Sequence, residues 1–539
     1  GHGGPGEALL STGLDAIPDS SPLIGVKLER LTADGDLEAM EAYAASLLDA
    51  GPVAAENLES ALFRMNRAGI PDGHPLIRKA CARLAEEIDG DAEAATYAAL
   101  GLDHYAALER PGAATPDDKR GPDIIAAEAL PPDPFAQAFA LIDGSDCRYT
   151  PDDRLLLFGN SLACGGMERV LAQTYRHFAA GRTFEHVDLA LFNYAEGQPS
   201  SHHRDEAGVR REDIELIEAR SPAGSLALSL PYSLAGRAQR LDDYIREKRP
   251  SVIHAWNDIT GVLAALCGLA AGCPRIVIHF HHTSVMPLSA RTAHPASFPS
   301  IYRRLIKQPG ISTIFCAEMA ARDYANWWSL PFSDAFRTIR NGFDWPDMPD
   351  KAAARALLGL PEAATIVGTV TRFDPVKQMD RWAEAAIAYA QRDPDAHFLL
   401  VGDGPERADI EAAFAAAGLA NRSHFAGRIE QTEDYYAAMD AFWMTSLSEG
   451  LPTVCIEAAA AGVPVIAFDV GGVRETVVDG ETGHVVAPND VNAMVSQTQA
   501  LLADDQARAK LGAAGAAFAR AEFSFDRYIA ELTKVYEGQ

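Results

Sequence analysis

Cysteine pairs, basic charge and long hydrophobic runs are all scarce in this sequence of 539 residues. The seven cysteines are scattered, odd in number and without a C-x-x-C pair, which excludes a thiolate zinc site and indicates reduced thiols, as in a cytoplasm. The formal net charge of −28 argues against nucleic acid as a partner, because phosphate binding needs a basic face. No apolar run approaches the ~20 residues of a membrane-spanning helix, so any membrane contact is expected to be peripheral, at the inner face.

The spacing of apolar residues divides the chain into sections of different character. Up to residue 120 it is helical, at i, i+3 and i+4, and a compact helical cap and a protein-docking module both remain open as its role. From residue 153 onward strands and helices alternate, which indicates an α/β architecture. The predicted divisions are an all-α N-terminal domain (1–120), a linker (121–152), two α/β domains (153–345 and 346–522) and a C-terminal helix (523–539).

Residues 440–479 form the passage around which the other motifs are arranged. An apolar run of strand length, residues 441–444, is followed by a polar turn and by an alanine-rich helix that begins at Thr453. Glu449 lies in the turn and Glu457 in the helix, eight positions apart. In an open parallel sheet a ligand lies outside the strand ends, where a helix N-terminus offers backbone NH groups to an anion. The two acids are therefore predicted to face a ligand, against the alternative of a turn residue and a solvated helix acid.

This passage resembles the E-x7-E segment of retaining glycosyltransferases of family 4. The resemblance implies the GT-B fold, in which two Rossmann-like domains face a cleft, here preceded by the all-α domain. It also implies that residues 523–539 cross back onto the acceptor-side domain, residues 153–345, while residues 346–522 bind the donor. In the family, the residue that matches Glu449 contacts the hydroxyls of the donor sugar, and the one that matches Glu457 holds the ribose.

Two further motifs match the same family. Gly165 and Gly166 precede a predicted helix, and a glycine pair lets backbone NH groups come close to a phosphate. The pair resembles the G-G-x-E-R-V loop that lines the family's cleft near the donor phosphates. Arg372 and Lys377 follow the strand predicted at residues 365–371, and two cations across a proline-containing turn can converge on one diphosphate.

Histidines gather where the strand predicted within residues 275–284 runs into a loop. A metal site is not expected, because alternate strand positions point to opposite faces and no carboxylate follows at ligand spacing. The family has a cleft histidine at this strand end, and the letters HTS align it best with His282, with His281 as the other register. His254 ends the preceding strand and is assigned with His281 to the acceptor side, with a purely structural role for His254 as the alternative.

These motifs define a predicted site that needs no metal and no cofactor, because cations and backbone NH groups can stabilise a leaving diphosphate. Catalysis is assigned to Glu449, His282, Arg372 and Lys377. Donor binding is assigned to Gly165, Gly166, Arg372, Lys377, Arg428, Ile429, Glu449, Gly450, Leu451, Thr453 and Glu457, and in the family the positions of Arg428 and Ile429 pack the nucleobase.

The resemblance implies a hexosyltransferase-type enzyme of class EC 2.4. It would move a sugar, with retention, from a UDP-, GDP- or ADP-linked donor to a saccharide or lipid-linked saccharide in bacterial surface polysaccharide or glycan synthesis. The alternatives are a sugar-nucleotide epimerase or a phosphorylase on the same fold, and a helical adaptor that carries a transferase-like domain. Cations and aromatics between Tyr302 and Phe332 suit a peripheral membrane contact or an acceptor contact. The alternative is that these aromatics belong to the core beside a solvated helix. The helical domain is a second candidate for a membrane or protein contact.

Overall fold

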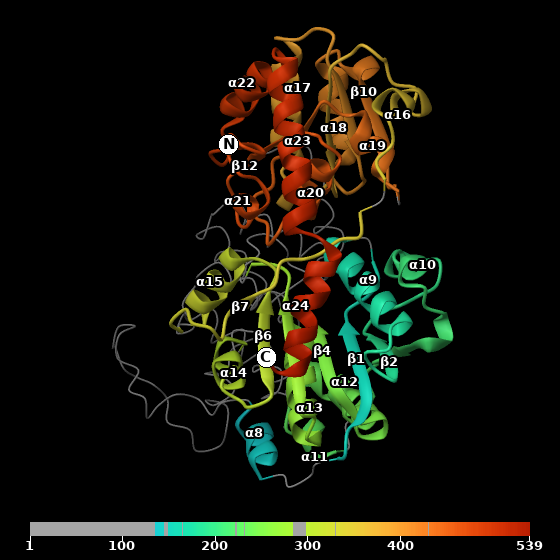
Figure 1. The fold of residues 1–539 in the computed structure, drawn as a ribbon, viewed down its shortest axis with the longest axis vertical. Coiled ribbons are helices and arrows are strands. Elements are labelled where there is room, and N and C mark those ends of the chain that lie inside the picture. The colour runs from blue at the N-terminus through green and yellow to red at the C-terminus, as the bar shows by residue number, and fades with distance from the viewer. Residues whose placement is uncertain are drawn as a thin grey trace, which may run out of the picture.

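The computed structural model describes residues 135–144, 149–163, 165–220, 224–230, 232–283, 298–328, 330–345, 347–429 and 431–539. The all-α domain predicted for residues 1–120 lies outside this part of the chain. The described residues form two α/β domains that are stacked along the long axis of the molecule, each around its own sheet (Figure 1).

The first domain contains a parallel sheet of seven strands in the order β3-β2-β1-β4-β5-β6-β7. Its strands are β1 (Asp152–Gly159), β2 (His186–Leu191), β3 (Ile214–Leu216), β4 (Pro250–Trp256), β5 (Arg275–Phe280), β6 (Ile311–Phe315) and β7 (Arg337–Thr338). The helices are α8 (Ala136–Asp143), α9 (Gly166–Ala180), α10 (Arg204–Ala207), α11 (Ser225–Leu228), α12 (Tyr232–Lys248), α13 (Asp258–Ala271), α14 (Phe298–Leu305) and α15 (Glu318–Trp327), with 3-10 turns at Pro199–Ser201 and Arg211–Asp213. Strand order reverses between β1 and β4, which is where ligands bind in open α/β sheets.

The central strands of this sheet are buried on both faces, which explains their continuous apolar runs. In β1, Leu155 and Leu157 join one core while Leu156 and Phe158 join the other, because successive side chains point to opposite faces. Helices cover both faces, so the sheet leaves only its strand ends free for a ligand.

The second domain contains a parallel sheet of six strands in the order β10-β9-β8-β11-β12-β13. Its strands are β8 (Ile366–Val370), β9 (His397–Val401), β10 (Ser423–Gly427), β11 (Ala441–Met444), β12 (Val465–Phe468) and β13 (Gly483–Val486). The helices are α16 (Lys351–Leu357), α17 (Met379–Ala390), α18 (Arg407–Ala416), α19 (Glu433–Ala438), α20 (Thr453–Ala460), α21 (Val473–Thr476), α22 (Val491–Leu502) and α23 (Asp505–Glu522), with 3-10 turns η3 (Pro375–Lys377) and η4 (Ala420–Arg422). Here the order reverses between β8 and β11.

The chain crosses between the domains twice, at neighbouring positions. Phe343 bridges to Ser524, and its NH donates to the carbonyl of Phe523 at 2.9 Å. After the second crossing, α24 (Phe525–Glu537) lies on the first domain, as the red helix in Figure 1 shows. Tyr528 and Leu532 of α24 are fully buried in a core that includes strands β1, β4 and β5. The last helix is therefore a structural part of the first domain.

The prediction of a linker over residues 121–152 is wrong for its described helix, α8. Phe135 and Phe139 lie one turn apart, and both are buried in the core against α13. Burial of two phenylalanines outweighs the loop character of the surrounding prolines.

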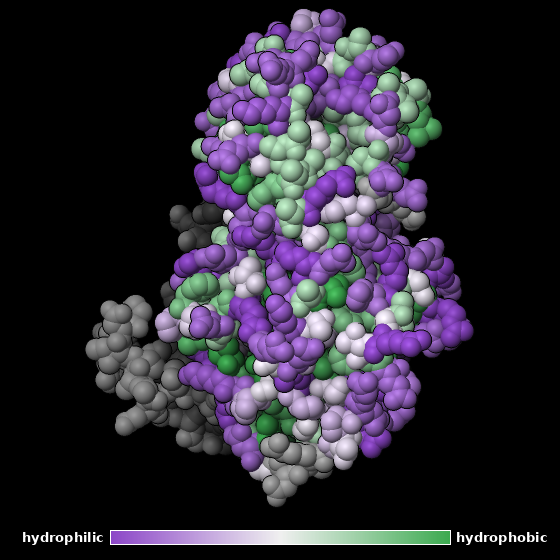
Figure 2. Space-filling model, viewed as in Figure 1, coloured by the Kyte–Doolittle hydropathy of each residue, from purple (hydrophilic) through white to green (hydrophobic). Residues whose placement is uncertain are grey.

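Membrane contact gains little support from the region between Tyr302 and Phe332. Tyr302, Tyr324 and Trp328 are fully buried, and only Phe332, at 41% exposure, is a large hydrophobic residue on the surface there. Hydrophilic residues cover most of the face seen in Figure 2. Among the described residues, no helix is long and apolar enough to span a bilayer.

Candidate active site

The two domains meet where the carboxyl ends of the central strands face each other. Arg169 Nη1 of the first domain lies 3.0 Å from Glu457 Oε1 of the second. The hydroxyls of Thr283 and Ser448 lie 3.2 Å apart across the same boundary. The boundary between the domains therefore brings together residues that follow the strands of both sheets.

Two helix N-termini converge at this boundary. A Cβ atom at Gly166, the first residue of α9, would lie only 2.5 Å from Oγ1 of Thr453, the first residue of α20. Any side chain at Gly166 would push the two helices apart. The first NH groups of a helix have no intrahelical acceptor and carry a partial positive charge, which is the chemistry that an anion needs.

Glu457 is held by contacts from both domains. Besides the ion pair with Arg169, it accepts a hydrogen bond of 2.7 Å from the hydroxyl of Tyr436. Arg169 in turn pairs with Glu206 at 3.0 Å. Burial alone would raise the pKa of Glu206, but the hydrogen bond from His203 and the charge of Arg169 outweigh it and lower the pKa to about 2. The Glu206 carboxylate is thus ionised and holds Arg169 in place, and Glu457 keeps lone pairs for a further hydroxyl donor.

Lys377 and Glu449, both predicted site residues, form a direct ion pair. Lys377 Nζ lies 2.7 Å from Glu449 Oε1, and the side chains are only 19% and 12% exposed. The loop that carries Glu449 is tied to the turn that carries Lys377, because the hydroxyl of Thr445 donates to the Lys377 carbonyl at 3.1 Å. A cation and an acid are therefore held side by side at the end of β11.

Arg372, the second predicted diphosphate cation, is more accessible. Its side chain is 65% exposed and pairs with Asp374 at 3.0 Å. Its charge reaches Glu168 at the start of α9: burial raises the pKa of the Glu168 carboxyl, while the charges of His203 and Arg372 act in the opposite direction. Arg372 thus lies near enough to the first domain for its charge to act on Glu168.

The loop of Gly450 and Leu451 packs directly against the first domain. A Cβ at Gly450 would lie 2.6 Å from the carbonyl oxygen of His281, so only glycine fits. Leu451, from the second domain, is buried in a core of the first. The E-x7-E passage is therefore in direct contact with the loop that follows β5.

His282 is the histidine that lies at the domain boundary. Its Nε2 lies 3.3 Å from Oδ2 of Asp258, a buried acid that also accepts from the hydroxyl of Tyr324 at 3.0 Å. The His282 side chain is 21% exposed. Asp258 and Tyr324 thus orient an imidazole at the end of β5, beside Gly450.

The acceptor-side prediction is wrong for His254 and His281. His254 is fully buried and its Nδ1 lies 2.7 Å from the hydroxyl of Tyr536 on α24. Both ring nitrogens of His281 are buried, and its ring packs at a tilt of 40° against that of His279, with 3.9 Å between centroids. Burial lowers the pKa of both imidazoles, so both rings are neutral and their nitrogens are closed to solvent. Both residues lie on the sheet face that α24 covers, which a local sequence pattern does not reveal.

Arg428 and Ile429 follow the edge strand β10. Arg428 is exposed, while Ile429 packs partly into a core of the second domain. No contact of either residue with the other predicted site residues is present, and their assignment stays a prediction. No group of three or more histidine, cysteine or acidic side chains in the described ranges could hold a metal ion, and metal independence likewise stays a prediction.

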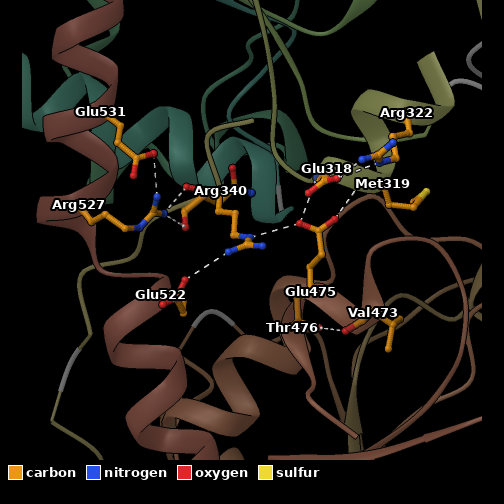
Figure 3. A network of polar contacts seen from close by, with 11 residues as sticks. Glu318, Met319, Arg322, Arg340, Val473, Glu475, Thr476, Glu522, Arg527 and Glu531 are labelled. Atoms are coloured by element: carbon orange, nitrogen blue, oxygen red, sulfur yellow. Dashed lines mark hydrogen bonds and ion pairs between the residues drawn. The ribbon is translucent and has the colours of Figure 1, made fainter. Parts of the chain in front are cut away.

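Sequence reasoning missed a second junction between the domains, shown in Figure 3. Glu475 of α21 accepts from the NH groups of Glu318 and Met319 at the start of α15, at 3.1 and 2.9 Å. Arg340, next to the crossing, lies 3.3 Å from Glu475 and 3.3 Å from Glu522. One carboxylate of the second domain therefore caps a helix of the first. The sequence shows Glu475 at the end of the segment GGVRE, but its partners lie more than a hundred residues away, so no local pattern could predict the junction.

Comparison with known proteins identifies the family. Residues 165–342 match the model of the glycosyl transferase 4-like domain, and residues 350–518 match that of glycosyl transferases group 1. The GDP-mannose-dependent alpha-(1-6)-phosphatidylinositol monomannoside mannosyltransferase of Mycolicibacterium smegmatis is 32% identical over 303 residues, which cover 53% of this chain and 76% of that protein. The chain belongs to this family of glycosyltransferases, which is of the predicted class EC 2.4.

Two further comparisons bear on length and fold. The Vi polysaccharide biosynthesis protein VipC/TviE of Salmonella typhi is 28% identical over 363 residues, and the chain spans 62% of its length, with 62% of this chain covered. The structure of Anabaena Alr3699/HepE in complex with UDP-glucose superposes with a TM-score of 0.60 and 20% identity, covering 72% of this chain and all of that one. The likeness in fold confirms the predicted GT-B class of two facing Rossmann-like domains.

Proposed function

We propose that this protein transfers a sugar, with retention of anomeric configuration, from a nucleoside diphosphate donor to a saccharide acceptor. The observation that carries the proposal is the domain boundary at which the N-termini of α9 and α20 meet and at which the second domain holds the Lys377–Glu449 pair. A nucleotide sugar needs this arrangement. Helix NH groups and a lysine bind its diphosphate, and carboxylates accept hydrogen bonds from the hydroxyls on either side of the diphosphate.

The donor sites follow from these positions. Glu457, fixed by Arg169 and Tyr436, accepts from the ribose hydroxyls. Arg372, which is exposed, and Lys377 bind the diphosphate, and Glu449 accepts from the hydroxyls of the transferred sugar. The relative from Mycolicibacterium smegmatis is named for its dependence on GDP-mannose, and HepE was crystallised with UDP-glucose, which supports a nucleotide sugar without choosing its base.

In the proposed reaction the bond between the anomeric carbon and the diphosphate oxygen breaks, and the acceptor oxygen forms the new bond on the same face. The leaving diphosphate takes up negative charge and the proton of the acceptor hydroxyl. Lys377, Arg372 and the helix NH groups stabilise that charge, which is the largest electrostatic demand of the step. His282, held by Asp258, lies at the boundary where the sugar would face the first domain.

The setting of the reaction belongs to the proposal as well. Four described cysteines, Cys267, Cys273, Cys316 and Cys455, are buried and unpaired, which supports a reducing cytoplasm. The name of the Salmonella relative supports a role in surface polysaccharide synthesis.

Two measurements test the proposal. Thermal shifts with UDP-, GDP- and ADP-sugars identify the donor base, because a ligand at 100 times its Kd raises stability by about 2.7 kcal/mol. Chromatography then follows the chosen donor with a panel of oligosaccharides. Release of nucleoside diphosphate together with a longer saccharide of unchanged anomeric form supports the proposal. Interconversion of nucleotide sugars, or cleavage that depends on phosphate, would refute it.

A further inference from the structure

A polar pocket of about 410 Å³ lies at the edge of the first sheet, where β2 and β3 end. Its lining consists of Phe192, Asn193, Tyr194, Ala195, Ser200, Leu216, Glu218, Ala219 and Arg237. Because all strands of this sheet are parallel, the pocket opens on the same side as the cleft. None of these residues belongs to the predicted donor site.

Arg237 gives the pocket an available positive charge. Its guanidinium carbon lies 4.5 Å from the centre of the Phe192 ring, which holds the planar group in place. No carboxylate in the described part of the chain lies within ion-pair distance of Arg237. Its neighbours on α12 differ, since Arg240 pairs with Glu215 and Arg246 with Asp242. In a chain of net charge −28, an arginine without an acid is free to bind an external anion.

The other polar groups of the pocket suit a sugar. The Asn193 amide donates to Asn160 at 3.2 Å and keeps its oxygen for a hydroxyl. Glu218 is exposed and, within the described ranges, makes no ion pair, so it can accept from two hydroxyls. Tyr194 is 8% exposed, and its buried hydroxyl has no partner in the described structure. Donors and acceptors close to an aromatic ring are the ordinary chemistry of saccharide binding.

Backbone hydrogen bonds connect the pocket to the loop that leads to the predicted donor site. The carbonyl of Ser200, in the pocket, accepts from the NH of Leu162 at 3.0 Å, and the Leu162 carbonyl accepts from His203 at 2.9 Å. Leu162 lies three residues before Gly165, and His203 contacts Glu206, the partner of Arg169. A saccharide seated in the pocket would therefore lie beside the loop that leads into the cleft.

We infer that this pocket binds an acidic sugar residue of the acceptor, with Arg237 paired to its carboxylate or phosphate. That the bound sugar belongs to an acceptor rests on the proposed function. That the pocket binds an acidic sugar rests on the pocket alone. A guanidinium stacked on a ring presents two parallel NH donors, the arrangement that a carboxylate or phosphate accepts.

The test measures binding of three probes to the full chain by saturation-transfer NMR titration: D-glucuronate, D-glucose 6-phosphate and D-glucose. The variants are Arg237→Gln and, as matched control, Arg392→Gln, an exposed arginine of the second domain that contacts Ser496 and Gln499 instead of an acid. Wild type and Arg392→Gln should bind at least one acidic probe more tightly than glucose. Arg237→Gln should weaken that binding by about tenfold or more, the usual effect of losing a charge-assisted pair.

Several results separate this inference from the proposed function. Binding of glucuronate alone, or of the phosphate alone, supports the inference and identifies the group. Equal binding by Arg237→Gln and wild type, or glucose binding as tightly as both acids, overturns it, provided that Arg237→Gln keeps the melting temperature of wild type. Donor binding should be unchanged in Arg237→Gln. A chain that binds the acidic probe through Arg237 but binds no nucleotide sugar would refute the proposed function and leave the pocket standing.

Discussion

Replacement of Glu457 by glutamine tests the donor site most directly. Glutamine has the same shape, so it removes the charge that Arg169 and the ribose hydroxyls require while leaving the packing of α20 in place. Hydrogen bonds to a charged group contribute about 1.5–3 kcal/mol each, so nucleotide diphosphate should bind roughly 10- to 150-fold more weakly. Arg169 keeps its contact with Glu206 at 3.0 Å, so the free energy of unfolding should fall by only about 1 kcal/mol.

Isothermal titration with the nucleoside diphosphate measures the first effect, and urea unfolding measures the second. Glu411→Gln is the matched control, because it also removes one negative charge but breaks only an exposed pair with Arg407 on α18. A Kd for Glu457→Gln within threefold of wild type would refute the assignment of Glu457. So would an equal loss in Glu411→Gln, which would point to net charge as the cause.

Four further changes should each have a distinct effect. Lys377→Ala removes the cation beside Glu449 and should lower kcat by about 100-fold in a donor-turnover assay. Gly166→Ala forces α9 away from Thr453 and should lower turnover by up to about 100-fold with the fold retained by circular dichroism. Glu475→Gln weakens the junction of Figure 3 and should lower the Tm by about 3 °C and increase the radius of gyration in small-angle scattering. Because the pKa of Glu206 is lowered to about 2, its contribution to stability is complete above pH 4.5 and is lost as the pH falls toward 2, so Glu206→Gln should flatten the pH dependence of urea unfolding in that window.

Each of these four predictions has a result that would contradict it. Wild-type turnover in Lys377→Ala or Gly166→Ala would remove those residues from the site. For the junction, Glu318→Gln breaks only an exposed pair with Arg322, and an equal effect of this control would show that Glu475 has no special role. An unchanged acid slope in Glu206→Gln would mean that this carboxylate is not ionised in the way the contacts with His203 and Arg169 require.

Local patterns in the sequence predicted most strands and the glycine loops, because burial on both faces leaves a continuous apolar run. The strand expected at residues 441–444 is β11, Ala441–Met444, and the strand expected at 365–371 contains β8, Ile366–Val370. The predicted Lys377 and Glu449 are brought into contact although 72 residues separate them. The family resemblance, rather than any local rule, assigned both positions to one site.

Long-range contacts account for what the sequence did not reveal. Arg169 and Glu457 are 288 residues apart, and nothing near either one marks the other as its partner. The choice between His281 and His282 depends on which side of β5 meets Asp258 and which meets the C-terminal helix, so it needed the packed structure. His254 was misassigned for the same reason, since its partner Tyr536 lies 282 residues further along the chain.

The return of α24 to the first domain sets an order on synthesis. A ribosome releases the strands of the first sheet long before it has made Tyr528, Leu532 and Tyr536, which cover part of one face of that sheet. Until residues 525–537 emerge, this part of the face has no permanent cover, and a fragment cut at the domain boundary would never gain one. The first domain is therefore translated first but can complete its core only after the second domain has been made.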